Sequence, residues 1–275
     1  MKPPQIPVTD DHIHIDPANG RGMEAVKDFR RSGGTHMFLV TKPSWSHGII
    51  PSRGEDFIEV FEANIKTAAM TGEEGVTAFP ILGVHPAEMT RMPDRMPLEQ
   101  AEVIMCDALS IAAEYVKEGR AVALKSGRPH YPVEDEILES SNRVLMHAIS
   151  LAAECGCALQ IHAESGPCTD VVNMAEDAKM PVYKVVKHFA IPETPLTPSM
   201  LAKHEAIPEM ANAGRLMTME SDYMDDNERP GAVIGPRSVP RYTRKMLETG
   251  AIDTETAFKI HKDNPEKIYG VEISL

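Results

Sequence analysis

An alternation along the chain is the strongest constraint on its fold. Short runs rich in β-branched and apolar residues are each followed by a longer amphipathic stretch. Repeated strand–helix units of this kind predict a parallel sheet covered by helices. The candidate strands are residues 8–15, 35–41, 76–84, 121–125, 158–163, 183–189, 196–200 and 215–221. The candidate helices are residues 22–32, 55–70, 98–117, 134–154, 169–178, 201–213 and 239–269.

Eight such strands in 275 residues predict an α/β protein with a (β/α)8 TIM barrel, a fold that typically needs about 250 residues. No repeat or linker divides the sequence, so we expect a single domain over residues 1–275. An open doubly wound sheet is the alternative. It would place a glycine-rich phosphate turn after the first strand, where DDHIHID (residues 10–16) stands instead.

Composition narrows the environment and the partners. No apolar run approaches the roughly 18 residues of a membrane span, and four scattered cysteines form no disulfide framework, so we expect a cytoplasmic protein without a membrane partner. The 41 acidic and 28 basic residues give a net charge of −13, which disfavours a broad nucleic-acid-binding surface. A bound divalent cation could still attract a phosphorylated substrate.

Two histidines in the first strand are the first candidate metal ligands. Residues i and i+2 of a strand point to the same face, so His12 and His14 are expected inside the barrel, with Ile13 and Ile15 turned toward the helices. On its own, this short pattern would also fit two structural histidines.

Further candidates stand at the predicted carboxyl ends of later strands, which meet at one mouth of a barrel. These residues are His85, Lys125, His162, His188 and Asp222. Neutral imidazole and carboxylate hold zinc, manganese or iron while leaving coordination positions to water. The sequence therefore predicts a metal site at the barrel mouth.

The motifs together resemble those of the TatD-like metal-dependent hydrolases in the amidohydrolase superfamily. The resemblance runs from residue 11 to residue 270 and rests on DDHIHID, GVHP, LQIH, VKHF, MESDYMDD and KDNPEKIYG. It is nearest to a divergent archaeal-type branch, because GRPHYP (residues 127–132) and RPGAVIGPRSVPR (residues 229–241) are unusual in bacterial members.

The resemblance also assigns roles to the candidate ligands. It implies that His12 and His14 bind one metal together with Asp222, whereas His162 and His188 bind a second. Asp222 would also orient or deprotonate the attacking water. His85 resembles a family histidine that contacts the substrate, so His85 and Asp222 are the expected catalytic residues.

Lys125 departs from the family pattern, in which this position carries a metal-bridging glutamate. An ammonium group beside two divalent cations would be repelled, so lysine cannot simply replace the carboxylate. Three states stay open: Lys125 reacts with CO2 to form an anionic carbamate, it stays cationic beside a single metal, or it swings out of the site. We favour the carbamate, with Lys125 as a metal ligand.

Arg128 and His130 follow Lys125 directly and are predicted to bind the substrate together with His85; arginine suits carboxylate and phosphate groups. Several other charged loop residues are expected to be merely solvated, and five further histidines to lack a site role. The first group is Lys42, Glu164, Lys187, Arg229 and Arg237, and the second is His36, His47, His147, His204 and His261.

These observations predict a hydrolase that activates water with one or two divalent cations, zinc first and magnesium or manganese as alternatives. Its expected substrate is a small phosphoester, amide or lactone, since the acidic surface disfavours DNA. The alternatives are a TatD-type DNA 3′-exonuclease and a barrel that binds metal or ligand without turnover. A homo-oligomer is also compatible with the sequence.

Overall fold

A computed structural model describes residues 6–229 and 233–275; the 229–241 loop therefore lies partly outside the described residues. The chain forms two compact units. The first joins Met1–Leu39, Thr67–Phe79 and Pro198–Leu275, and the second joins Val40–Lys66 and Pro80–Thr197. Each unit is built from separate stretches of sequence. The expectation of one domain over residues 1–275 stays a prediction.

In the second unit, parallel strands lie next to one another in chain order. They are β3 (Thr77–Gly83), whose first three residues belong to the first unit, β4 (Ala123–Gly127), β5 (Ala158–His162) and β6 (Val185–Lys187). Their register places Lys125 beside Gly83 on one side and Gln160 on the other, and Gly127 beside His162. This register brings the carboxyl ends of the strands to one edge, where the predicted ligands stand.

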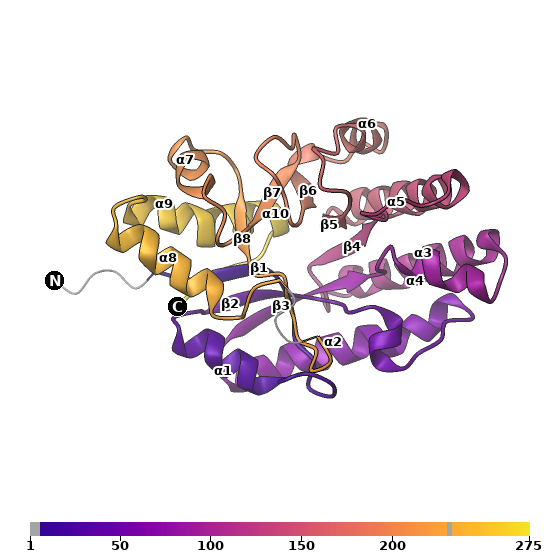
Figure 1. Cartoon of the computed structure of the whole chain (residues 1–275), viewed down its shortest axis with the longest axis horizontal. Helices are drawn as coiled ribbons and strands as arrows, with labels where there is room; N and C mark the ends of the chain where they lie inside the picture. Colours follow the sequence, from indigo (N-terminus) through magenta and orange to yellow (C-terminus); the bar gives the residue numbers. More distant parts are fainter. Residues whose placement is uncertain (1–5, 230–232) are drawn as a thin grey trace. The chain divides into compact units, whose positions relative to one another are not determined.

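Long amphipathic helices cover these strands. Buried residues of α4 (Leu98–Lys117) recur at helical spacing, for example Ala101, Ile104, Met105 and Ala108, which explains why this stretch forms a helix with one core-facing side. Figure 1 shows α4 beside α5 (Asp135–Cys155), and the two helices are in contact. Shorter helices in or entering this unit are α2 (Ile58–Glu73), α3 (Glu88–Arg91) and α6 (Asp170–Asp177), with 3-10 turns η1 (Ser44–His47), η2 (Gly54–Phe57), η3 (Met92–Asp94) and η4 (Val182–Lys184).

In the first unit, β1 (Thr9–His14) pairs in parallel with β2 (His36–Val40) and with β9 (Tyr223–Met224), while β7 (Thr197–Leu201) pairs with β8 (Thr218–Glu220). Ile13 and Ile15 pack into a core cluster with Val26 and Phe29 of α1 (Met23–Arg31). The isoleucines thus face a helix, as the alternation of side chains along a strand predicts.

The sequence identified the class of fold. Each predicted strand overlaps an observed one, strands alternate with helices, and the strand pairs within each unit are parallel, as in the (β/α)8 barrel class. The structure adds the short β9 and α3. Among the described residues, no helix is both long and apolar enough to cross a membrane.

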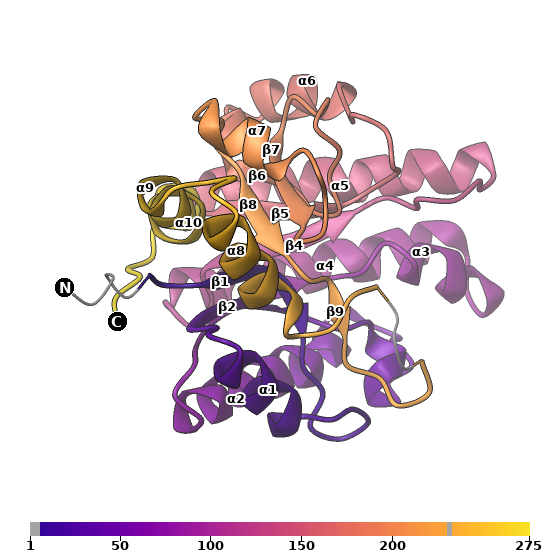
Figure 2. The ribbon, with the colours of Figure 1, turned by 60° about the vertical axis from the view of Figure 1, so that its left-hand side comes forward.

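The prediction of one C-terminal helix over residues 239–269 is wrong. This stretch forms α8 (Ser238–Glu248), α9 (Thr254–Phe258), a π-helical turn (Lys259–Asp263) and α10 (Asn264–Tyr269), shown in Figure 2. Gly250 adopts a φ of 70° and ends the first piece, and Asp253 begins the next by accepting the backbone N–H of Thr256 at 2.7 Å. Likewise, the helix predicted over residues 201–213 is only α7 (Ile207–Asn212), because Leu201 ends β7 and residues 202–206 form turns.

Candidate metal centres

The two histidines of β1 form the core of a candidate centre in the first unit. His12 and His14 are both buried, and their Nε2 atoms lie 3.2 Å apart. Two ligands each about 2.0–2.1 Å from a tetrahedral ion would be separated by about 3.4 Å. The spacing of these nitrogens therefore fits a pair of ligands to one cation.

Asp222 lies beside this pair. Its carboxylate Oδ1 is 3.8 Å from His12 Nε2, and its backbone N–H donates to the His12 carbonyl at 2.9 Å. Asp222 has a φ of 46°, a left-handed conformation that aspartate tolerates better than most residues. The His12 side chain is fully buried and that of Asp222 is 14% exposed, so the carboxylate is the group through which this cluster meets solvent.

Two acids that the sequence analysis did not single out hold this arrangement in place. Asp10 accepts the backbone N–H groups of Ser221 at 2.9 Å and of His12 at 3.3 Å, and burial raises the pKa of Asp10 to about 7. Asp225 is also buried and accepts the Tyr223 hydroxyl at 2.9 Å, together with the backbone N–H groups of Asp16, Arg21 and Gly22. Asp10 lies within DDHIHID and Asp225 within MESDYMDD, so their places in these two motifs could have identified them as part of the site.

A cluster of imidazoles forms the candidate centre of the second unit. His162, at the end of β5, lies 2.8 Å (Nδ1) from His188 Nε2 and 2.7 Å (Nε2) from His130 Nδ1, and its ring centroid is 4.7 Å from that of His85. Burial lowers the pKa of His162 well below its ordinary value, and the positive charges of neighbouring groups lower it further. His162 is therefore neutral at pH 7, which is the form that binds metal.

Glycines at two strand ends permit this close packing. A Cβ atom at Gly83 would lie 1.9 Å from the Lys125 carbonyl oxygen, and one at Gly127 would lie 1.8 Å from the His162 carbonyl oxygen. No other residue type fits at either position without moving the neighbouring strand. The glycines of GVHP and GRPHYP therefore serve to bring the strand ends together.

Lys125 lies inside the second unit, with only 2% of the residue exposed. Its charge contributes to lowering the pKa of His162, so the ammonium group stands near the imidazole cluster and not in solvent. Lys187 of β6 is 1% exposed and acts on His162 in the same way. The expectation that Lys187 and Lys42 are solvated loop residues is wrong, because the strand ends bury both side chains.

Arg128 was predicted to bind substrate, but in this structure its guanidinium is occupied by other side chains. It forms a two-pronged contact with Glu164, donates to Asp170 at 2.5 and 3.0 Å, and reaches Asn142 at 3.2 Å. Burial acts to lower the pKa of Arg128, but the hydrogen bonds that its guanidinium donates to the Asp170 and Glu164 carboxylates outweigh burial and raise it. The residue fastens the loop after β4 to α6, and Glu164 is correspondingly paired, not merely solvated.

The structure thus brings the predicted residues into two sets. His12, His14 and Asp222 are together in the first unit, and His85, Lys125, His130, His162 and His188 are together in the second. His12, His188 and Asp222 are candidate metal ligands, because each offers a ring nitrogen or a carboxylate oxygen that can bind a cation. Both donor sets suit a borderline divalent cation. The described histidines outside these sets include His261, which is fully buried and hydrogen-bonded to Thr243 at 2.8 Å.

Comparisons with known proteins identify relatives over nearly the whole chain. The family model of the TatD-related DNases matches residues 9–270. The uncharacterized protein MJ1127 of Methanocaldococcus jannaschii is 37% identical over 282 residues, which cover 98% of both chains.

Solved structures show the same fold at low sequence identity. The Escherichia coli TatD homologue YjjV superposes with a TM-score of 0.62 at 15% identity, covering 96% of this chain and 98% of that one. The E. coli phosphotriesterase homology protein, solved with phosphate in its active site, has a TM-score of 0.60 at 8% identity, covering 97% and 99%. The lactonase Lmo2620 of Listeria monocytogenes has a TM-score of 0.60 at 14% identity, covering 96% and 95%.

Proposed function

The chain belongs to the TatD-related DNase family and is a metal-dependent hydrolase, and we propose that it hydrolyses small phosphoesters, amides or lactones. The observation that carries this proposal is the convergence of His12 Nε2 and His14 Nε2, 3.2 Å apart, beside the Asp222 carboxylate. Such a set can hold a divalent cation and a water together. Zinc is the metal we expect, with magnesium or manganese as alternatives.

In the first unit, His12, His14 and Asp222 would hold one cation. A divalent cation bound there polarises the scissile group and lowers the pKa of a bound water. Asp222 is the partly exposed member of the set, so its carboxylate can accept a hydrogen bond from the attacking water, orient it and take its proton. The buried Asp10 fixes the backbone on both sides of this site by accepting from Ser221 and His12.

In the second unit, His162 and His188 would hold a second cation, with Lys125 as its anionic partner. For this role the uncharged Lys125 Nζ attacks the carbon of CO2 and loses a proton, which leaves a carbamate with charge −1. The burial of Lys125 beside the imidazole cluster supports this role over a lysine that swings out to solvent.

His85 and His130 would contact the substrate. Both rings lie against His162, with ring centroids at 4.7 and 4.8 Å, and each can donate or accept a hydrogen bond. The solved structures of similar fold include a lactonase and a phosphotriesterase homologue with phosphate in its active site, which supports ester-like substrates.

Metal analysis combined with hydrolysis assays tests the proposal. The purified protein should contain zinc or another divalent metal and should hydrolyse at least one of bis(p-nitrophenyl) phosphate, p-nitrophenyl esters, anilides and lactones. Asp222→Asn should lower kcat by at least 100-fold, whereas Asp177→Asn, an equivalent change at an exposed helical position, should leave it unchanged. A metal-loaded protein that is inert on every class would favour a binding barrel without turnover.

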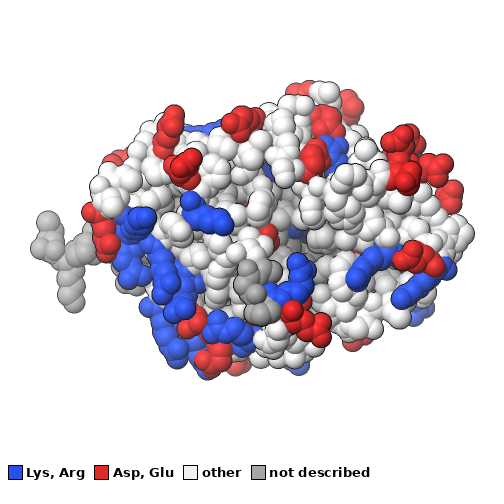
Figure 3. Space-filling model, viewed as in Figure 1, with Lys and Arg blue, Asp and Glu red and all other residues white. Residues whose placement is uncertain are grey.

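One observation favours nuclease activity as a second candidate. Basic side chains gather on the face of the first unit that carries α1 and α8 (Figure 3), and Arg244 of α8 donates to the Ser32 carbonyl after α1 at 2.8 Å. Arg21, Arg237 and Arg241 line a cavity of about 310 Å³ there, together with the two acids Asp225 and Asp226. A local basic surface can bind a phosphate backbone although the whole chain is acidic.

The nuclease candidate has its own test. It requires release of nucleotides from single-stranded DNA, lost steeply as salt rises, and weaker DNA binding by Arg241→Gln. No release at low salt with zinc, manganese or magnesium would eliminate it and leave the small-molecule hydrolase.

A further inference from the structure

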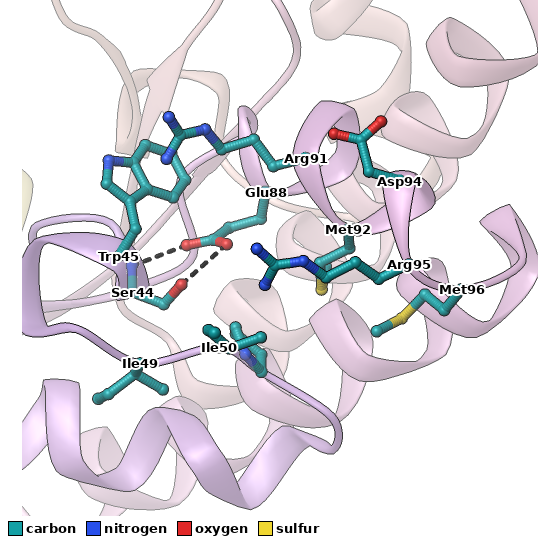
Figure 4. A pocket seen from close by; sticks show the side chains of 11 residues that line it. Ser44, Trp45, Ile49, Ile50, Glu88, Arg91, Met92, Asp94, Arg95 and Met96 are labelled. Carbon is teal, nitrogen blue, oxygen red and sulfur yellow. Dashed lines mark hydrogen bonds between the residues drawn. The ribbon is translucent and has the colours of Figure 1, made fainter.

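A second cavity, in the second unit, is lined by none of the candidate metal ligands, and the proposed reaction does not yet use it. It has a volume of about 300 Å³ and is formed by the segments that follow β2 and β3 in the chain, including η1, α3 and η3. Cavities that bind small molecules begin at about this size. Figure 4 shows Ser44, Trp45, Ile49 and Ile50 on one side and Arg95 with Met92 and Met96 on the other, while the Arg91 side chain reaches from α3 over the Trp45 ring.

Much of the cavity wall is apolar. Trp45, Ile49, Ile50, Met92 and Met96 line it. Ile50 is 64% exposed, the largest exposure among the large hydrophobic residues described. An apolar body placed against these side chains would remove their surface from water, which favours binding.

Two arginines give the cavity an anion-binding character. The Arg91 guanidinium carbon lies over the Trp45 ring, 4.1 Å from its centroid. Among the described residues, neither Arg91 nor Arg95 forms a side-chain hydrogen bond or ion pair. Their donors are thus available to a carboxylate or phosphate.

The acidic residues of the wall do not occupy these donors. Glu88 is buried and accepts the backbone N–H of Ser44 at 2.8 Å and the Ser44 hydroxyl at 3.0 Å, so both of its oxygens are used by η1. No ion pair joins the exposed Asp94 to either arginine within the part of the chain that the structure describes. The charge of Arg91 acts on the nearby Glu88 carboxylate, but among the described residues neither guanidinium gives its hydrogen-bond donors to an acid of the wall.

The cavity also adjoins the imidazole cluster. The Trp45 ring meets the His85 ring edge-on, with centroids 6.3 Å apart, and His85 in turn lies against His162. A molecule seated on Trp45 would extend toward the proposed second metal centre from the side of His85.

We propose that this cavity binds the non-reacting part of the substrate, an apolar body that ends in an anionic carboxylate or phosphate held by Arg91 and Arg95. This proposal rests on the proposed hydrolase function and names its substrate class: small amphipathic organic anions. The apolar wall accepts the body, and the two guanidinium groups select the charged end.

Binding to the inactive Asp222→Asn protein tests the cavity without turnover. Titration calorimetry would compare 4-phenylbutyrate and phenyl phosphate with the neutral 4-phenylbutyramide. We expect the anions to bind at least tenfold more tightly than the amide, and Arg95→Gln to weaken anion binding about tenfold while changing amide binding less than twofold. Arg31→Gln, the same change at an exposed arginine of the other unit, should have no effect.

Trp45→Leu provides a second variant, because it keeps an apolar wall and removes the platform under Arg91; it should also weaken anion binding. Equal affinity for the amide and the anions, or unchanged anion binding in both Arg95→Gln and Trp45→Leu, would overturn the proposal. In the active protein, hydrolysis without any preference for anionic substrates would overturn it while leaving the hydrolase function standing. Anion binding without any hydrolysis would support the cavity and refute the proposed function.

Discussion

His261 offers a quantitative test of the first unit, because it is a fully buried histidine far in sequence from the strand that it supports. Its Nδ1 accepts the backbone N–H of Thr9 at 3.2 Å, and its Nε2 lies 2.8 Å from the Thr243 hydroxyl, which itself donates to the Val239 carbonyl at 2.9 Å. This network fits the neutral ring with its hydrogen on Nε2. The side chain thereby links the start of β1 to α8.

Burial lowers the pKa of His261 from 6.5 to about 4 in the folded chain. Between pH 6.5 and pH 4, the imidazole of His261 is therefore protonated more readily in the unfolded chain than in the folded one. The contribution of His261 to the free energy of unfolding is complete above pH 6.5 and is lost as the pH falls toward 4. The full loss is about 1.36 × 2.5, or roughly 3 kcal/mol, and about 2 kcal/mol of it should appear between pH 7 and pH 5.

Urea unfolding of the metal-free protein from pH 7 to pH 5 measures this loss. His261→Gln cannot titrate, so the free energy of unfolding of the wild type relative to His261→Gln should fall by about 2 kcal/mol over this range. Thr243→Val is the matched control, because it removes the hydroxyl contact but keeps the imidazole; its pH dependence should run parallel to that of the wild type. A His261→Gln protein with the same pH dependence as the wild type would refute the reasoning.

Three further predictions concern the second unit. Gly127→Ala should prevent soluble folding or lower Tm by more than 10 °C, because its Cβ would lie 1.8 Å from the His162 carbonyl oxygen. Its control is Gly119→Ala, whose Cβ would meet no atom within 4 Å; it should lower the free energy of unfolding by only about 1 kcal/mol, because of its φ of 71°. Arg128→Met should destabilise the protein by about 2 kcal/mol in urea unfolding, since it removes charge-assisted hydrogen bonds to partly exposed Glu164 and Asp170; an unchanged midpoint would show that this network contributes nothing. Lys125→Ala should lower hydrolysis at least 100-fold, and added acetate or propionate should restore part of it; a Lys125→Ala protein with full activity would exclude any role for a carbamate.

Much of the fold could be predicted because local pattern and burial agree in it. The runs that became β1 to β6 combine β-branched residues with turn signals, and α4 matches its predicted bounds because its apolar residues keep a helical period over its whole length. The C-terminal region could not be predicted as well. Its apolar residues also keep a helical spacing, but Gly250 and the Asp253 cap interrupt the helix, and these local signals are weaker than the periodicity.

The gathering of the candidate ligands could be predicted for a similar reason, since strand ends collect side chains from distant parts of the sequence; their role as metal ligands stays a prediction. The partners of Arg128 could not, because Glu164 and Asp170 are 36 and 42 residues away and only the folded loops bring them together. The burial of Lys187 escaped prediction as well. From the sequence, a lysine at the end of a three-residue strand cannot be told from a loop residue, because its burial depends on the neighbouring strands.

The charges around His162 affect how many metal ions the protein can bind. Two buried lysines, Lys125 and Lys187, act on this imidazole, so a cation held by His162 and His188 would meet two positive charges if both amines were protonated. Conversion of Lys125 to a carbamate changes its charge from +1 to −1 and would supply the missing anion. Metal content should therefore depend on CO2. Protein prepared and loaded with zinc in CO2-free buffer should bind one equivalent, and addition of bicarbonate should raise this to two, whereas Lys125→Gln should bind one equivalent in both buffers. Two equivalents without bicarbonate would show that the histidines hold the second cation beside an unmodified lysine.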